Sequence, residues 1–261
     1  MSDFNSKSLS LHEFRTAEPT AATETMASPR AEPRPGWAFA KRVFDIGFSL
    51  GLLPVLLALV PVLWLANRRR NPGPLFFLQT RMGRHCRPFT LVKFRTMVPA
   101  GAAVRGFDDP LEVDRITPLG AFLRKTRIDE LPQILNILHG EMSVIGPRPD
   151  VWEHATVYCR IVPGYRERHQ VRPGITGLAQ TRIGYADGLN ATRRKAFADN
   201  IYIRNMGFGL ELLILRQTVG TVLSGFGLGA DTPMTARRRG EPVRTAEEDQ
   251  AATPAFGQVT A

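Results

Sequence analysis

An uncharged, apolar stretch of 21 residues, Ile46–Ala66, constrains this chain more than any other feature of its sequence. As a helix it is long enough to cross a hydrocarbon core of about 30 Å. It starts far from the first residue and no A-x-A cleavage pattern follows it, which argues against a secretory signal. As a helix this stretch would be apolar on all sides, whereas the surface helix of a soluble protein carries a single apolar stripe. The sequence therefore predicts a membrane-embedded helix, with a core helix of a soluble protein as the weaker alternative.

Charges and prolines around this stretch bear on how it enters the membrane. Lys41 and Arg42 precede it, and three arginines, Arg68–Arg70, follow it. Basic residues favour the cytoplasmic face, so a simple span would force one of the two clusters across. Pro54 and Pro61 also interrupt the helix from within. Both features favour a re-entrant hairpin that dips into the membrane and returns to the same face, over a single span.

The composition on either side of this segment divides the chain of 261 residues. Residues 1–36 are rich in Ala, Thr, Ser, Glu and Pro, and residues 230–261 have a similar character. Segments of this kind bury too little apolar surface to fold, so both are predicted to be disordered tails. Residues 37–70 then form the membrane-embedded part, and residues 71–229 form a cytoplasmic domain.

The pattern of residues 71–229 predicts an α+β fold that is mostly helical. Apolar runs at 75–78 and 89–94, separated by a turn at 82–84, indicate a short β-hairpin. The last helical pattern, 210–223, has a polar side and is expected to lie in the membrane surface as an interfacial amphipathic helix. The other predicted helices cover 116–127, 131–139, 153–169 and 192–204.

The basic residues are almost all arginines: 29 of the 34, in a chain of formal charge +10. Arginine suits bidentate phosphate binding, so phosphates, nucleic acids and anionic membranes are candidate partners, although arginine-rich codon usage is an alternative explanation. No helix-turn-helix, zinc or RNP-type motif occurs, and the two cysteines form no CxxC. We therefore expect no nucleic-acid partner.

Two adjacent carboxylates, Asp129 and Glu130, follow a basic run at 124–127. A helix beginning near Asp129 would accommodate Pro132 in its first turn. Its N-terminus would keep the carboxylates ionised and attract anions. Because neighbouring helical positions lie about 100° apart, one carboxylate could face a substrate while the other binds a metal. The alternative is a plain capping pattern that starts at Thr126.

Other candidate residues lie in rigid turns and on the predicted hairpin. Pro147 and Pro149 fix the backbone on both sides of Arg148, which suits a phosphate-binding arginine or a plain turn. Lys93 lies on the second predicted strand, either in a site or on an exposed strand edge. The segment Arg172–Gln180 is a compact turn whose two glycines permit close approach to a ligand, or simply a tight loop.

Several segments, taken in order, resemble the bacterial sugar transferases, which are monotopic polyprenyl-phosphate phosphoglycosyl transferases. They are "KRVFD", "NPGPLFF", "KFRTM", "TPLGAFLRKTRIDELPQILNILHGEMSVIGPRP" and "RPGITGLAQ". The resemblance covers about Lys41–Ser224. The chain looks like the small form of the family, similar to exopolysaccharide-priming enzymes.

The resemblance implies transfer of a sugar 1-phosphate from a UDP-sugar to undecaprenyl phosphate, with release of UMP. Membrane lipids are implied partners, and the catalytic domain would lie on the cytoplasmic face of the bacterial inner membrane. The identity of the sugar is left open, and a homodimer is compatible with the sequence. The alternative function is that of a non-catalytic membrane-surface scaffold with the same fold.

The resemblance also implies roles for the acidic pair. Asp129 corresponds to the nucleophile, which would form an aspartyl phosphosugar, and Glu130 corresponds to a residue that helps hold Mg²⁺. Carboxylate oxygens and diphosphates are ligands that Mg²⁺ prefers. A late D-x-x-Y pattern, Asp199 and Tyr202, also matches, but its role does not follow from the sequence.

The implied substrate-binding residues come from three segments. Lys93 and Arg148 would bind phosphate, and Thr176 and Gln180 would face the nucleotide. The family often carries Asn-Gly-Arg soon after this glutamine, whereas this chain reads "QTRIGYADG". Arg182 is therefore the candidate substitute for the missing arginine.

Overall fold

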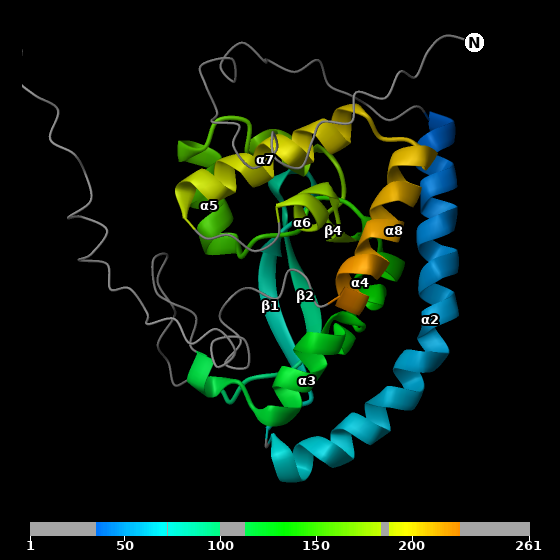
Figure 1. Cartoon of the computed structure of the whole chain (residues 1–261), viewed down its shortest axis with the longest axis vertical. Coiled ribbons are helices and arrows are strands. Elements are labelled where there is room, and N and C mark those ends of the chain that lie inside the picture. Colours follow the sequence, from blue (N-terminus) through cyan, green and yellow to red (C-terminus); the bar gives the residue numbers. More distant parts are fainter. Residues whose placement is uncertain (1–34, 72, 100–112, 184–187, 225–261) are drawn as a thin grey trace, which may run out of the picture. The chain divides into compact units, whose positions relative to one another are not determined.

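The computed structural model describes residues 35–71, 73–99, 113–183 and 188–224 (Figure 1). The predicted tail at 230–261 lies outside these residues, as does the predicted tail at 1–36 except for its last two residues. The helices are α2 Pro35–Arg70, α3 Pro118–Thr126, α4 Gln133–His139, α5 Trp152–Ile161, α6 Leu178–Arg182, α7 Leu189–Arg204 and α8 Phe208–Ser224, with 3₁₀ turns η2 Arg84–Cys86, η3 Val113–Arg115, η4 Ile128–Glu130 and η5 Arg166–Gln170. The strands are β1 Phe76–Met82, β2 Pro88–Phe94, β3 Ser143–Ile145 and β4 Gly174–Thr176.

The predicted apolar segment forms α2, one continuous helix of 36 residues that contains Pro54 and Pro61. Figure 1 shows this helix as a single curved ribbon rather than two antiparallel arms. Proline removes a helical hydrogen bond and crowds the preceding turn, which accounts for a bend without a break. Among the described residues, it is the one helix long and apolar enough to cross a membrane, and only 17% of its most apolar window is buried. That exposure contradicts the alternative of a soluble core helix.

The beginning of α2 is fixed to the rest of the domain by polar contacts. The guanidinium of Arg42 donates hydrogen bonds to the carbonyls of Ile137 and Leu138, at 2.6 and 3.0 Å. The buried Asp45 carboxylate accepts hydrogen bonds from the Ser143 hydroxyl and the Val144 amide, both at 3.0 Å. These contacts join α2 to the end of α4 and to β3.

The middle and the end of α2 contact the same domain. Leu56 and Leu63 are buried in a cluster with side chains of β2, α3 and α4. Directly after the helix, the Asn71 amide donates a hydrogen bond to the Arg95 carbonyl at 3.0 Å. The helix is therefore held along its length, although most of its surface is exposed.

The predicted β-hairpin is confirmed. Strands β1 and β2 pair antiparallel, from Phe76 opposite Phe94 to Met82 opposite Pro88, so β1 extends beyond the predicted 75–78. A second sheet was not predicted: β3 and β4 pair in parallel, with Ser143 opposite Gly174. The compact turn expected at Arg172–Gln180 thus contains a short strand followed by α6.

Glycines make this parallel pair possible. A Cβ atom on Gly174 would lie 2.1 Å from the Gly146 amide nitrogen, and one on Gly177 would lie 2.2 Å from the Gly146 carbonyl oxygen. Such distances exclude every larger residue unless the backbone moves. The close approach brings the turn that carries Arg148 beside the segment that carries Thr176.

The predicted helices at 116–127, 131–139, 192–204 and 210–223 are confirmed as α3, α4, α7 and α8. The predicted helix at 153–169 is wrong in its second half, because α5 ends at Ile161. Pro163 and Gly164, which has a φ of +72°, follow and redirect the chain into η5.

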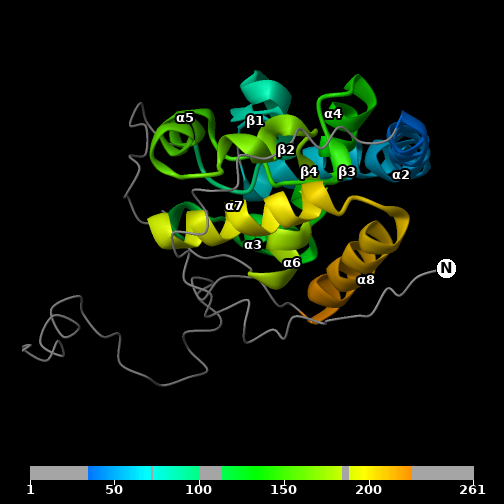
Figure 2. The same cartoon turned by 90° about the horizontal axis from the view of Figure 1, so that it is seen from above.

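The beginning of α8 lies near the beginning of α2, and Figure 2 shows the rest of α8 leading away from α2 (Figures 1 and 2). The Lys41 ammonium on α2 pairs with the Glu211 carboxylate on α8 at 2.8 Å. Phe208, Leu212 and Val219 of α8 are exposed, whereas Ile214 is buried. Like α2, α8 therefore presents exposed apolar side chains.

Candidate active site

The acidic pair occupies η4, the 3₁₀ turn between α3 and α4. Arg127 precedes it in the left-handed conformation, with a φ of +59°, and α4 begins three residues after Glu130. The carboxylates thus lie just before a helix N-terminus, close to the predicted position. The capping alternative is not observed, because the Thr126 hydroxyl donates to the Phe122 carbonyl within α3 at 2.9 Å.

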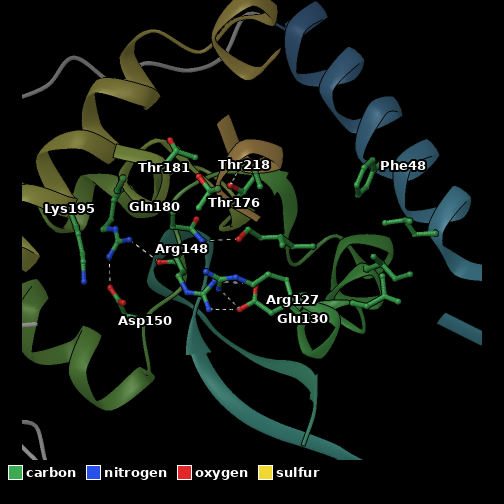
Figure 3. Close-up of a pocket in the computed structure, with 17 residues that line it drawn as sticks. Phe48, Arg127, Glu130, Arg148, Asp150, Thr176, Gln180, Thr181, Lys195 and Thr218 are labelled. Carbon is green, nitrogen blue, oxygen red and sulfur yellow. Dashed lines mark hydrogen bonds and ion pairs between the residues drawn. The ribbon is translucent and has the colours of Figure 1, made fainter. Parts of the chain in front are cut away.

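Three basic side chains surround the Glu130 carboxylate, and two of them, Arg127 and Arg148, are drawn in Figure 3. One oxygen, Oε1, lies 2.9 Å from the Lys93 ammonium, 2.6 Å from an Arg148 guanidinium nitrogen and 3.9 Å from an Arg127 guanidinium nitrogen. Burial alone would raise the pKa of Glu130, but Arg148 and Lys93 hold that pKa well below its usual value. Burial in turn lowers the pKa of Lys93, against the opposing effect of Glu130.

Asp129 is equally buried but differently partnered. Among the described residues, its Oδ1 atom has no hydrogen-bond partner. Burial, followed by repulsion from Glu130, raises the pKa of Asp129, although Lys93 and Arg148 oppose this. A desolvated carboxylate with an unsatisfied oxygen, next to several cations, is typical of a reactive or ligand-binding group rather than of a structural ion pair.

A cavity of about 250 Å³ extends from this cluster. Figure 3 shows Phe48 of α2 on one side, Lys195 and Asp150 on the opposite side, and Glu130 with Arg148 between them. Glu130 lines the cavity, whereas Asp129 is not one of the lining residues. The other lining residues are Leu52, Arg127, Leu131, Ile134, Arg168, Ile175, Thr176, Ala179, Gln180, Thr181, Thr218 and Thr221. One cavity therefore joins an apolar end formed by α2 to a charged centre and a polar end.

Three of the predicted substrate-binding residues, Arg148, Thr176 and Gln180, line the cavity. The Thr176 hydroxyl shares a hydrogen bond of 2.6 Å with that of Thr218, which joins β4 to α8. The Gln180 amide nitrogen donates to the Ile175 carbonyl at 2.9 Å. Lys93 approaches the cavity through its contact with Glu130, whereas Arg182 lies outside the lining.

No motif in the sequence indicated Arg168, which lies in a segment predicted to be helical. Its side chain is 3% exposed and pairs with Asp150 and, at 2.8 Å, with Asp199. It also donates a hydrogen bond of 2.8 Å to the carbonyl of Arg148. Against the effect of burial, Arg168 lowers the pKa of Asp150 to about 2, and burial raises the pKa of Asp199 to about 6. Arg168 thus fixes the backbone at Arg148.

The late D-x-x-Y pattern now has a structural role. Asp199 is the buried partner of Arg168. The Tyr202 hydroxyl donates to the Glu211 carboxylate at 2.7 Å, and Glu211 also pairs with Lys41 of α2. The pattern therefore connects α7 to the cavity wall, to α8 and, through Glu211, to α2.

The acidic pair is also suited to a magnesium ion completed by substrate. In the described part of the chain, no group of three or more His, Cys, Asp or Glu residues could hold a metal. Mg²⁺, however, is commonly held by one or two carboxylates together with water and substrate phosphates. Asp129 and Glu130 supply such carboxylates, and the unsatisfied Oδ1 of Asp129 fits this chemistry.

Comparison with known proteins identifies relatives of this chain. A family described as "Bacterial sugar transferase" matches residues 36–225. A UDP-N-acetylgalactosamine-undecaprenyl-phosphate N-acetylgalactosaminephosphotransferase from Aeromonas hydrophila is 41% identical over 75% of this chain and 46% of its own length. The "Exopolysaccharide production protein PSS" of Rhizobium leguminosarum bv. phaseoli is 40% identical over 70% of this chain and 95% of its own length.

A third relative is a UDP-glucose:undecaprenyl-phosphate glucose-1-phosphate transferase from Caulobacter vibrioides, which is 38% identical over 74% of this chain and 73% of its own length. This chain spans about half of the Aeromonas protein but nearly all of the Rhizobium protein. The family match includes α2, both sheets and the whole cavity wall. The chain belongs to the bacterial sugar transferase family.

Proposed function

We propose that this protein transfers a sugar 1-phosphate from a UDP-sugar to undecaprenyl phosphate, forming undecaprenyl-diphosphate-sugar and UMP. The names of several relatives support this reaction, since they specify glucose-1-phosphate or N-acetylgalactosamine phosphate transfer to undecaprenyl phosphate. The observation that carries the proposal is the cavity, which joins buried acidic and basic groups to apolar side chains of α2. A soluble phosphorylated sugar and a lipid phosphate would meet in such a cavity.

In the first step, the Asp129 carboxylate attacks the phosphorus that bears the sugar. A bond forms between that phosphorus and an Asp129 oxygen, and the bond to the UMP oxygen breaks, so UMP leaves with the electron pair. The unsatisfied Oδ1 atom supports Asp129 as the nucleophile. Arg148 and Lys93, which now contact Glu130, would stabilise the charge on the transferred phosphate.

In the second step, an oxygen of undecaprenyl phosphate attacks the phosphorus of the aspartyl phosphosugar. The new bond completes the diphosphate, and the Asp129 carboxylate is released in its starting form. Glu130 would help hold Mg²⁺, which would supply positive charge against the negative charge of the phosphates. Thr176 and Gln180 would face the nucleotide, as their positions in the cavity wall allow.

The proposed location is the cytoplasmic face of the bacterial inner membrane, with α2 as a re-entrant segment. Contacts at both the beginning and the end of α2 hold it to the same domain. A helix that passed straight through a bilayer would carry one end away from that domain. The exposed apolar side chains of α2 and α8 support insertion of these helices into lipid, with α8 at the interface. The reaction would be the priming step of exopolysaccharide or surface glycan synthesis.

The deciding experiment measures UMP release from a panel of UDP-sugars in the presence of Mg²⁺ and undecaprenyl phosphate. Wild type and Asp129→Asn are compared, with Asp114→Asn, an exposed residue of η3, as the matched control. Release by wild type and the control, but not by Asp129→Asn, supports the covalent mechanism and names the sugar. Release that survives Asp129→Asn indicates direct attack by the lipid phosphate. No release from any donor favours the non-catalytic scaffold.

A further inference from the structure

We infer that Lys195 of α7 is the cation that binds the nucleotide phosphate of the donor, at the end of the cavity that lies opposite α2. This inference rests on the proposed function and deepens it. It assigns the two ends of one cavity to two substrates: the nucleotide at the Lys195 end and the lipid at the Phe48 and Leu52 end.

The direction of the donor in the cavity follows from the character of the two ends. The reacting phosphorus must lie at the centre, near Glu130 and Asp129. From there the remaining phosphate and the uridine extend to one side. Phe48 and Leu52 make the α2 side apolar, and placing a charged phosphate and a polar nucleoside there would leave them poorly solvated. The opposite end offers Lys195, Thr181 and Gln180, so the nucleotide extends in that direction (Figure 3).

Lys195 is the basic residue at this end that is placed to reach a ligand. Arg168 also lines the cavity, but it is buried and is held by Asp150, by Asp199 and by the Arg148 carbonyl. Moving Arg168 would break all three contacts. Lys195 is half-buried, and its flexible stem can carry the ammonium group to a phosphate as a point charge.

The surroundings of Lys195 fit a binding role. Figure 3 shows Lys195 beside Asp150, and its positive charge is a small contribution that lowers the pKa of Asp150 and opposes the burial that raises the pKa of Asp199. Arg168 already pairs with both of them, so each carboxylate keeps an ion-pair partner when Lys195 turns away. Lys195 can therefore turn towards an incoming phosphate while the contacts of Arg168 remain in place.

The rival is Arg182, which the sequence indicates as the substitute for the family's missing arginine. It lies on α6, outside the cavity lining, whereas Lys195 forms part of that lining. The two assignments predict different results for otherwise similar substitutions.

The test compares Lys195→Met with Arg182→Met and with Arg194→Met, which removes the neighbouring charge on α7 outside the cavity lining. The full-length protein in detergent or nanodiscs is used, and the affinity for UDP is measured by calorimetry at two salt concentrations. Loss of a charge-assisted phosphate contact in Lys195→Met should weaken UDP binding on the order of tenfold or more and reduce its salt dependence. Lys195→Arg should retain most of the affinity, and Arg194→Met should match wild type.

Steady-state kinetics supply the second readout. Lys195→Met should raise KM for the UDP-sugar with a smaller change in kcat, and leave KM for undecaprenyl phosphate unchanged. Wild-type affinity for UDP in Lys195→Met, or a loss seen in Arg182→Met instead, would overturn the inference. If wild type binds UDP through Lys195 but releases no UMP from any donor, the proposed function fails while the inference stands. Lys195→Gln serves as a second variant if Lys195→Met melts at a lower temperature than wild type.

Discussion

Asp129 and Glu130 are adjacent and similarly buried, yet their pKa values shift in opposite directions. Glu130 directs its carboxylate at Lys93 and Arg148, which outweigh the effect of burial. For Asp129, burial and the negative charge of Glu130 outweigh the opposing effect of the same cations. The difference therefore arises from side-chain direction rather than depth. It separates a carboxylate held by ion pairs from one that is available to react.

The first prediction concerns Asp129→Asn. Because the folded pKa of Asp129 is raised, its ionised form opposes folding, and stability from this group is lost as pH rises through that pKa. At neutral pH, the amide should therefore unfold at a temperature equal to or above that of wild type. UMP release should fall by about 10⁴-fold or more. Thermal melts and UMP assays on the same sample test both effects, and a large loss of stability would contradict this account.

Loss of activity on acidification is a second consequence of the same shift. The attacking carboxylate must be ionised, so UMP release should decline as pH falls through the raised pKa of Asp129. The wild-type rate is measured from pH 8 downwards under single-turnover conditions without lipid acceptor. A rate that stays constant to below the usual pKa of an aspartate would count against Asp129 as the nucleophile.

Glu130→Gln should have the opposite effect on stability. Its depressed pKa means that ionised Glu130 stabilises the fold above the unfolded pKa, and that this stability is lost as pH falls through the folded value. Removing the charge leaves Lys93 and Arg148 without their carboxylate, which should cost about 3 kcal/mol at neutral pH. Denaturant unfolding at pH 7 and at a series of lower pH values tests this, because the difference from wild type should shrink as pH falls through the folded pKa of Glu130.

At the scale of elements, the parallel pair β3–β4 depends on the absence of side chains. Gly174→Ala would place a Cβ atom 2.1 Å from the Gly146 nitrogen, so the strands must separate. We expect a loss of about 3 kcal/mol in the free energy of unfolding, together with weaker phosphate binding through a displaced Arg148. Gly220→Ala in α8 is the control, because nothing lies within 4 Å of its added Cβ. That variant should gain about 0.5–1 kcal/mol.

The same elements show what the sequence can and cannot predict. Helical periodicity predicted α3, α4, α7 and α8, and two apolar runs separated by a turn predicted the hairpin, because these signals are local. Strands β3 and β4 were missed, since each has three residues and is stabilised by a partner about 30 positions away. The helix predicted at 153–169 is too long because Pro163 and Gly164, a pair that ends helices, lie within that range.

The site was predictable to a similar degree. The motifs indicated Arg148, Thr176 and Gln180, and all three line the cavity. Arg168 and Lys195 come from different segments with no motif of their own, and folding alone places them there. Arg182 illustrates the converse: proximity in sequence to a motif did not place it in the cavity lining.

At the scale of the whole molecule, the attachment of both ends of α2 to one domain predicts its membrane topology. Single cysteines are introduced as Gly36→Cys and Arg68→Cys, near the two ends of α2, in a background of Cys86→Ser and Cys159→Ser. In inside-out vesicles, an impermeant maleimide should label both positions. Labelling of one position in inside-out vesicles and of the other in right-side-out vesicles would establish a single span instead.

The burial of Leu56 and Leu63 among side chains of β2, α3 and α4 has a practical consequence. A transmembrane anchor that merely tethers an enzyme can be deleted to obtain a water-soluble fragment. Deleting α2 here would uncover Phe94, Leu123 and Ile134 and remove one wall of the cavity. Truncated versions that begin after Arg70 should therefore aggregate, and crystallisation or drug screening will require the intact polypeptide in a lipid mimetic.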